Sequence, residues 1–373
     1  RAVTRETDTV ARLGGDQFLV QVEAVAGEQA LAAMARNVLR AADAPLRVAG
    51  RDVVASLSIG VALAGEYADD VDGLLKCADA AMRAAKLAGG SRHRAYEPQM
   101  EADHRQRLDL DLRLRRALER GEFFLVYQPI VDAEGHGIVA VEALLRWADP
   151  ERGVISPADF IPLLEQSGLI VPVGRWTMHE ACRRGRAWLD KGAEDLVMSV
   201  NVSPRQFAEP DFVQTVAAVL AETGLPRGHL QLEVTEGLLL EPTPQTLHKI
   251  DALVAAGVRL AVDDFGMGYS SLAYLKRFPL HALKIDRMFV RDLPEQRQDA
   301  AIVRAIVDLG HGLGLHVTAE GVEEADQFHE LRLLGCDSMQ GYLFARPVAA
   351  AEMTGVLAQP GRFGAAPSEA APS

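Results

Sequence analysis

The sequence predicts two domains, a small α+β piece followed by an α/β domain of the (β/α)8 type. The first observation is size, because 373 residues with 49% hydrophobic content are enough for two packed cores. The second is a change of pattern, since apolar strand candidates alternate with amphipathic helices only after residue 121. We therefore expect a partial α+β domain at 1–98, a linker helix at 99–121, a barrel at 122–357 and a disordered tail at 358–373.

The N-terminal segment begins with a hairpin pattern about Gly14 and Gly15. Because the chain opens at Arg1 without Met, and this hairpin has nothing before it to pack against, we expect upstream sequence that could hold a sensor or a membrane anchor. The predicted elements are a hairpin of residues 10–13 and 18–22, a helix at 29–42, a strand at 53–63 and a second helix at 71–88.

A charged segment at residues 103–120 predicts the linker helix. Leucine pairs at i,i+4 spacing run along it, and it stops at Gly121. Two interpretations remain equally open, a continuous signalling helix between the domains and a helix packed on one of them.

The barrel is predicted from eight strand candidates with helical patterns between them. The tail is rich in Ala, Pro, Gly and Ser, so burial cannot offset its loss of conformational entropy. The strand candidates are residues 123–131, 139–145, 196–202, 230–234, 259–262, 282–285, 316–319 and 338–343.

Composition excludes several classes of protein. The net charge of -13 argues against a partner that is a nucleic acid polymer, because such proteins gain affinity from basic phosphate contacts. Three widely spaced cysteines indicate neither a zinc site nor a disulfide framework. No apolar run approaches the roughly 20 residues of a spanning helix. We expect a cytoplasmic protein, and any membrane anchor would lie in upstream sequence.

The residues that end the predicted strands are polar, and in this kind of barrel catalytic groups lie at those strand ends. Taken singly, each could be a helix N-cap or a solvated charge. Together they crowd like charges, which is unfavourable unless cations neutralise them. In chain order they are Glu142, Asn201, Glu233, Asp263 with Asp264, Lys284 with Asp286, Glu320 and Gln340.

The chemistry that this set favours is metal-dependent phosphodiester hydrolysis. Hard oxygen donors select Mg2+ or Mn2+. Where the strand breaks, Asp263 and Asp264 could reach one site and hold two ions about 3.5 to 4 Å apart, a spacing suited to phosphoryl displacement. Lys284 could orient the water or neutralise developing charge. Glycoside hydrolysis ranks lower, because it does not call for a flanking lysine and an asparagine ligand.

The strand-end residues lie in seven short motifs that occur in one order between about residues 105 and 350. The ordered set closely resembles the EAL-domain family of cyclic di-GMP phosphodiesterases, with no motif missing. A lone EAL tripeptide would carry no information. The motifs are EALLRW at 142–147, NVS at 201–203, EVTE at 233–236, DDFGMGYSSL at 263–272, LKIDR at 283–287, AEGVE at 319–323 and QGYLFARP at 340–347.

The resemblance implies a role for each matching residue. Lys284 would help to bind the attacking water, and Glu320 is also a candidate general base. Gln340 and Arg146 would hold the substrate, while Glu236 would order the DDFG loop and couple the site to a homodimer. The implied metal ligands are Glu142, Asn201, Glu233, Asp263, Asp264 and Glu320.

The N-terminal segment resembles the second half of a GGDEF domain, the diguanylate cyclase family. The signature at 12–18 reads RLGGDQF, so Gln17 stands where the family has a glutamate, and an amide is a poorer Mg2+ ligand than a carboxylate. The family's first half is absent from this chain. The resemblance therefore implies a regulatory segment rather than a cyclase.

Arg5 and Asp8 match the RxxD inhibitory site of that family, which binds cyclic di-GMP. A surface Arg/Asp pair is the competing interpretation. If the site is real, cyclic di-GMP or GTP at this segment would regulate the barrel. Two alternatives stay open for the whole chain, a sensor or partner-docking barrel without catalysis, and a bifunctional cyclase and phosphodiesterase completed by upstream sequence.

Overall fold

The computed structural model describes most of the chain, in two compact units, Arg1–Leu110 and Asp111–Ser373. Among the described residues, no helix is long and apolar enough to span a membrane. Most of the tail expected at 358–373 lies outside the described residues. Those left undescribed are residues 1–2, 6, 43–45, 49–50, 54–55, 69, 135–136, 241–242, 267–275 and 360–373.

The N-terminal unit is a small α+β structure, as predicted. Strands β1 and β2 form the hairpin, and β5 pairs in parallel with β6. Helix α2 packs closely on β5 at Gly60, where a side chain would not fit: a Cβ there would be 1.9 Å from the carbonyl oxygen of Ala78. The elements are β1 (Thr9–Gly14), β2 (Gln17–Gln21), α1 (Glu28–Ala42), β3 (Leu46–Val48), β4 (Arg51–Val53), β5 (Ser58–Val61), α2 (Val71–Leu87), β6 (Arg92–Ala95) and α3 (Gln99–Ala117).

Helix α3 crosses the division between the units. Near its start, Met100 is buried in the core of the N-terminal unit with Cys77 and Tyr96. Within the second unit, Leu114 is buried and Arg113 forms an ion pair with Asp149 at 3.3 Å. The helix predicted at 103–120 therefore exists, and its two ends belong to different units.

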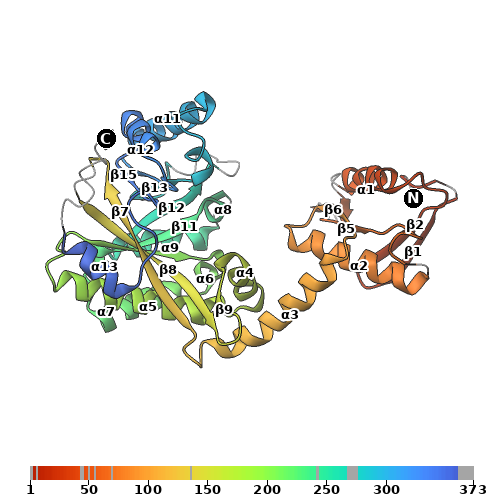
Figure 1. Ribbon diagram of the computed structural model, residues 1–373, viewed down its shortest axis with the longest axis horizontal. Helices are drawn as coiled ribbons and strands as arrows, with labels where there is room; N and C mark the ends of the chain where they lie inside the picture. The colour runs from red at the N-terminus through yellow and green to blue at the C-terminus, as the bar shows by residue number, and fades with distance from the viewer. Residues whose placement is uncertain are drawn as a thin grey trace, which may run out of the picture. The chain divides into compact units, whose positions relative to one another are not determined.

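The second unit contains a closed barrel with helices outside it, and Figure 1 shows α5 and α7 along one side and α11 and α12 along another. Its strands are β7 (Phe123–Asp132), β8 (Ile138–Asp149), β9 (Gly153–Ile155), β10 (Val197–Val202), β11 (Leu230–Thr235), β12 (Arg259–Phe265), β13 (Ala282–Ile285), β14 (His316–Ala319) and β15 (Ser338–Met339). Its helices are α4 (Pro157–Ser167), α5 (Ile170–Leu189), α6 (Pro204–Ala208), α7 (Phe212–Thr223), η1 (Arg227–His229), α8 (Glu236–Leu240), α9 (Pro244–Ala255), η2 (Arg287–Phe289), α11 (Arg297–Gly312), α12 (Ala325–Leu334) and α13 (Ala350–Leu357).

The barrel closes because β8 pairs with both β7 and β10, while β15 pairs with β7. Strands β8 and β10 to β15 run parallel, which confirms the predicted barrel of the (β/α)8 type. The first strand differs from a regular barrel, since β7 is antiparallel to both of its neighbours. A short β7–β8 connection makes this possible, because only antiparallel strands can be joined by a tight turn.

The last strand is shorter than predicted. Residues 338–343 were expected to be extended, but β15 ends at Met339. Gly341 lies so close to the main chain of Val322 that a Cβ at this glycine would be 1.9 Å from the Val322 carbonyl oxygen. The chain therefore leaves the sheet directly before Gln340 and turns across the end of the barrel.

Candidate functional site

Lys284 lies at the centre of a cluster of acidic side chains at the carboxyl ends of the barrel strands. Its side chain is 1% exposed. Its Nζ donates to Glu233 Oε2 at 2.8 Å and to Glu142 Oε2 at 3.5 Å. The same ammonium forms ion pairs with Asp263, at 3.6 Å, and with Glu320. Four strands of the barrel and the loop after a fifth therefore meet at one buried cation.

Glu142 is held by two amides as well as by this lysine. Asn201 Nδ2 donates to its Oε1 at 2.6 Å, and Gln340 Nε2 donates to its Oε2 at 2.6 Å. Burial opposes ionisation of Glu142, but Lys284 and the two amides outweigh burial and lower its pKa. This carboxylate is therefore fixed in position and charged.

Asp263 and Asp264 face one site because the end of β12 is irregular. The pairing with β13 shifts register between Val262 and Phe265, and Asp264 has a left-handed φ of 53°. Neighbouring side chains on a regular strand would point to opposite faces. Here oxygen atoms of Asp263, Asp264 and Glu320 lie within 4.8 Å of one another.

The pKa values indicate more negative charge than the chain neutralises. Burial and the neighbouring carboxylates raise the pKa of Glu233 well above its usual range. Burial also raises the pKa of Glu320 to about 8, and partial burial with Asp263 raises that of Asp264 to about 6. The pKa of Lys284 is raised, because its acidic neighbours outweigh its burial. A set of oxygen donors with surplus negative charge fits hard divalent cations such as Mg2+ or Mn2+.

The remaining predicted residues lie around this cluster. Arg146 on β8 is half-buried, and burial lowers its pKa, while Glu142 and Tyr342 act in the opposite direction. Glu236 begins α8 and is buried, and its Oε2 accepts a hydrogen bond from the amide of Gly266 at 3.2 Å. Glu236 therefore holds Gly266, the first residue after β12, in place. The rest of this loop, residues 267–275, lies outside the described part of the chain.

Two buried polar residues, Ser199 and Gln128, and the partly buried Gln231 complete the cluster and were not expected. Ser199 donates to Glu233 Oε1 at 2.5 Å and accepts from Gln231 at 3.1 Å. Gln128 accepts from Gln340 Nε2 at 3.0 Å. Each interrupts an otherwise apolar strand. Ser199 precedes Asn201 by two residues, so both face the same side of the strand, and this spacing could have indicated from the sequence that Ser199 belongs to the site.

The residues singled out in the N-terminal unit form a local turn. The amide of Arg5 donates to Asp8 Oδ2 at 2.7 Å, and the amide of Asp8 donates to the carbonyl oxygen of Arg5 at 3.1 Å. Asp16 and Gln17 are exposed at the hairpin turn. These hydrogen bonds between Arg5 and Asp8 are made within the N-terminal unit.

Comparison with known families agrees with this geometry. Residues 111–347 match the model of the EAL domain, and residues 1–92 match that of the diguanylate cyclase, GGDEF domain. The chain belongs to the EAL-domain family. The EAL match lies within the second compact unit, and the GGDEF match covers most of the first.

Curated relatives are similar along most of this chain. It is 43% identical over 358 residues to the bifunctional diguanylate cyclase/cyclic di-GMP phosphodiesterase MucR of Pseudomonas aeruginosa, covering 96% of this chain and 52% of that protein. It is 40% identical over 341 residues to the cyclic di-GMP phosphodiesterase PdeR of Escherichia coli, covering 91% and 51%. The chain thus spans about half the length of these relatives.

A solved structure resembles the EAL barrel itself. The PaMucR phosphodiesterase in complex with c-di-GMP is 47% identical, with a TM-score of 0.64. The match covers 66% of this chain and 99% of that one. An EAL domain of Mycobacterium smegmatis DcpA is 36% identical, with a TM-score of 0.56 over 64% of this chain and 98% of that one.

Proposed function

We propose that the EAL barrel hydrolyses cyclic di-GMP to linear pGpG with the help of two Mg2+ or Mn2+ ions. One observation carries the proposal: four carboxylates surround the buried ammonium of Lys284 at the barrel mouth, and Asp264 lies beside two of them. Two relatives in the same family are named cyclic di-GMP phosphodiesterases, and one barrel was solved with this nucleotide.

The proposed metal site is centred on Asp263 and Asp264, whose oxygens lie close to Glu320. The other ligands would be Glu142, Asn201 and Glu233. When bound, divalent ions supply Lewis-acid chemistry that activates water and offsets charge that develops on the phosphate. The donor set fits such ions because the carboxylates outnumber the cation in contact with them.

Lys284 and Glu320 would act directly on the reaction. Lys284 is held among the carboxylates, where its ammonium can orient the attacking water and balance developing negative charge. Burial raises the pKa of Glu320 to about 8, which makes its ionised form a stronger base for the water's proton than an ordinary carboxylate. The Lys284 ammonium and the Glu320 carboxylate form an ion pair, so both could contact the same water molecule.

Arg146 and Gln340 would bind the substrate. A guanidinium can donate to a phosphate oxygen, and Arg146 lies near Glu142 on the same strand. Gln340 is anchored by Gln128 and Glu142, which fixes its side chain at the mouth. Glu236 would order the DDFG loop through its contact with Gly266 and so connect the site to a homodimer of EAL barrels.

The other parts of the chain receive regulatory roles in this proposal. We keep the division expected from the sequence, with residues 1–98 as a regulatory GGDEF-like segment and 99–121 as the connecting helix. Arg5 and Asp8 would bind cyclic di-GMP or GTP there. A cytoplasmic location is supported by the three cysteines, which are free and buried.

The test is hydrolysis of cyclic di-GMP by purified protein with Mg2+ or Mn2+, following pGpG by chromatography. Asp263→Asn should lower turnover by at least about a thousandfold, or about 4 kcal/mol in the barrier, because it removes a ligand central to both ions. Asp251→Asn makes the same chemical change on α9, at an exposed position, and should leave turnover unchanged. Tight substrate binding by the unaltered protein without any pGpG would instead make this chain a sensor.

A further inference from the structure

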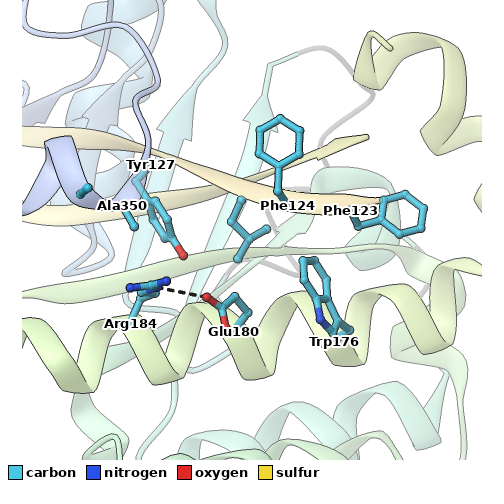
Figure 2. A pocket seen from close by; sticks show the side chains of 9 residues that line it. Phe123, Phe124, Tyr127, Trp176, Glu180, Arg184 and Ala350 are labelled. Carbon is cyan, nitrogen blue, oxygen red and sulfur yellow. Dashed lines mark hydrogen bonds and ion pairs between the residues drawn. The ribbon is translucent and has the colours of Figure 1, made fainter. Parts of the chain in front are cut away.

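A pocket of about 520 Å³ lies outside the catalytic mouth, between β7, α5 and α13. Figure 2 shows Tyr127 pointing from β7 toward an ion pair on α5. Pockets of this size hold small organic ligands. The residues that matter for its chemistry are Leu125 and Tyr127 on β7, Trp176, Glu180 and Arg184 on α5, and Ala350 on α13.

The Tyr127 hydroxyl is a buried donor at the floor of this pocket. The residue is 1% exposed, and among the described residues its hydroxyl has no hydrogen-bond partner. Its ring is held edge-on to Trp188 at 4.9 Å, and Trp188 Nε1 donates to Thr354 at 2.9 Å. Burial raises the pKa of Tyr127, so the group stays protonated. A buried hydroxyl without a partner is unfavourable, so a ligand acceptor would be bound well here.

Arg184 and Glu180 form the polar end of the pocket lining, and Arg183 lies next to Arg184 on α5, outside that lining. Glu180 accepts hydrogen bonds from Arg183, at 2.7 and 2.8 Å, and from Arg184, at 3.1 Å. Two guanidinium groups thus share one carboxylate. The Arg184 side chain is 40% exposed, so its pair with Glu180 is weak and can rearrange at small cost. A carboxylate is a ligand group that can accept from both the Arg184 guanidinium and the Tyr127 hydroxyl.

We propose that this pocket binds a small aromatic carboxylate, with its ring beside Leu125 and Trp176 and its carboxylate on Tyr127 and Arg184. The aromatic and aliphatic wall suits a flat apolar body. The hydroxyl and the guanidinium lie at one end of that wall, which fixes the orientation of the ligand.

The pocket is connected to the catalytic mouth through β7. Successive side chains of a strand face opposite sides, so Gln128 points inward where Tyr127 points outward. Gln128 Nε2 donates to the carbonyl oxygen of Ala345 at 3.0 Å, and its Oε1 accepts from Gln340. Tyr127 also exchanges two main-chain hydrogen bonds with Val348, at 2.8 and 2.9 Å. A ligand between β7 and α13 therefore acts on the segment that carries Gln340; this coupling rests on the proposed function, whereas the binding site does not.

The test measures binding of 2-naphthoate to the full chain by calorimetry. Tyr127→Phe removes only the hydroxyl and should weaken binding about fivefold, and Arg184→Gln about tenfold. Arg186→Gln removes an exposed guanidinium from the same helix that does not line the pocket, and should change affinity less than about twofold. The cation 2-naphthylmethylamine should bind more weakly than 2-naphthoate.

Three results would overturn the site. The first is no binding of 2-naphthoate, and the second is an affinity for 2-naphthoate in the Tyr127→Phe and Arg184→Gln variants equal to that of the unaltered protein. The third is displacement of 2-naphthoate by cyclic di-GMP in simple competition. Asp263→Asn protein should bind the probe with unchanged affinity, which separates failure of this site from failure of the catalytic proposal. Saturating 2-naphthoate should change the affinity for cyclic di-GMP at least about twofold, and an unchanged affinity would refute the coupling.

Discussion

Polar side chains lie at both ends of the barrel strands, but among the described residues they are crowded carboxylates at the carboxyl ends and two histidines with neutral hydrogen-bond partners at the amino ends. At the carboxyl ends, Lys284 contacts four carboxylates. At the amino ends, His281 accepts a hydrogen bond from the amide of Leu260 at 3.3 Å, and His316 lies 2.9 Å from the hydroxyl of Ser338. These two hydrogen-bond partners are neutral, and Arg259 and Asp337, the charged groups near the histidines, are of opposite sign. The comparison teaches that unbalanced charge, rather than polarity, identifies the site.

The largest expected effect comes from removing the cation at the mouth. Lys284→Met should lower the free energy of unfolding by about 3 to 5 kcal/mol without divalent ions, because it leaves buried carboxylates without their partner. Urea unfolding in a chelator measures this. Lys191→Met, at an exposed position, is the control. Equal stability of the two variants would mean that the mouth is not electrostatically strained.

Divalent ions should reverse the order of stability between the unaltered protein and Asp263→Asn. In a chelator the variant should be more stable, by about 1 kcal/mol, because it carries one charge less in the crowded cluster. With ions at a hundred times their Kd, binding adds about 2.7 kcal/mol to the unaltered protein. Thermal unfolding of both proteins in both conditions tests this, and parallel shifts would contradict it.

Two buried serines, Ser199 and Ser338, allow a matched comparison of the carboxyl and amino ends of the barrel strands. Ser199→Ala removes a hydrogen bond to Glu233, and Ser338→Ala removes hydrogen bonds shared with Thr318 and His316. Each should cost about 1 to 2 kcal/mol of stability. Only the first should also lower turnover and metal affinity, because only Ser199 orients a proposed ligand. Equal loss of turnover in both variants would remove the distinction between the ends.

The smallest effect is a dependence on pH at the amino ends. Burial lowers the pKa of His281 and of His316 below the usual value near 6.5. The unfolded chain then takes up protons before the folded chain does, so stability is present above about pH 6.5 and falls below it. Since both side chains are partly exposed, each should contribute less than about 0.5 kcal/mol per pH unit.

Matched substitutions isolate this pH effect from that of the mouth. His281→Asn keeps an acceptor near Nδ1, and His316→Gln keeps a polar atom near Nε2, and neither titrates. The double variant should lose stability less steeply than the unaltered protein between pH 7 and pH 5 in thermal unfolding with saturating Mg2+. An unchanged slope would assign the acid sensitivity to other groups.

The barrel and the strand-end residues were predictable because both follow from local patterns. Each strand is an apolar run, and each ends in a residue whose type carries the chemistry, as at Glu233 and Lys284. The break at Asp263 and Asp264 was expected from the glycine-containing loop, and the left-handed Asp264 agrees with it. The roles of these residues remain proposals.

Other features depend on contacts distant in sequence. The pairing of β7 with β15, more than 200 residues later, closes the barrel, and nothing within β7 encodes this partner. Gln128 and Ser199 find their partners only in the assembled barrel, so their polar type was visible but their function was not. The outer pocket exists only where β7 meets α5 and α13.

The pairing of the first strand with the last part of the chain has a consequence for folding. Gln128 bonds to Gln340 and to Ala345 across 212 and 217 residues of sequence, and these closures are entropically slow to form. During synthesis, the strands from β8 to β14 can assemble before Gln340 has left the ribosome. Glu142 then lacks one of its amide partners, and the mouth is complete only when Gln340 has joined the barrel. Catalytic competence would therefore arrive in a single late step, after the strands that carry the other site residues have assembled.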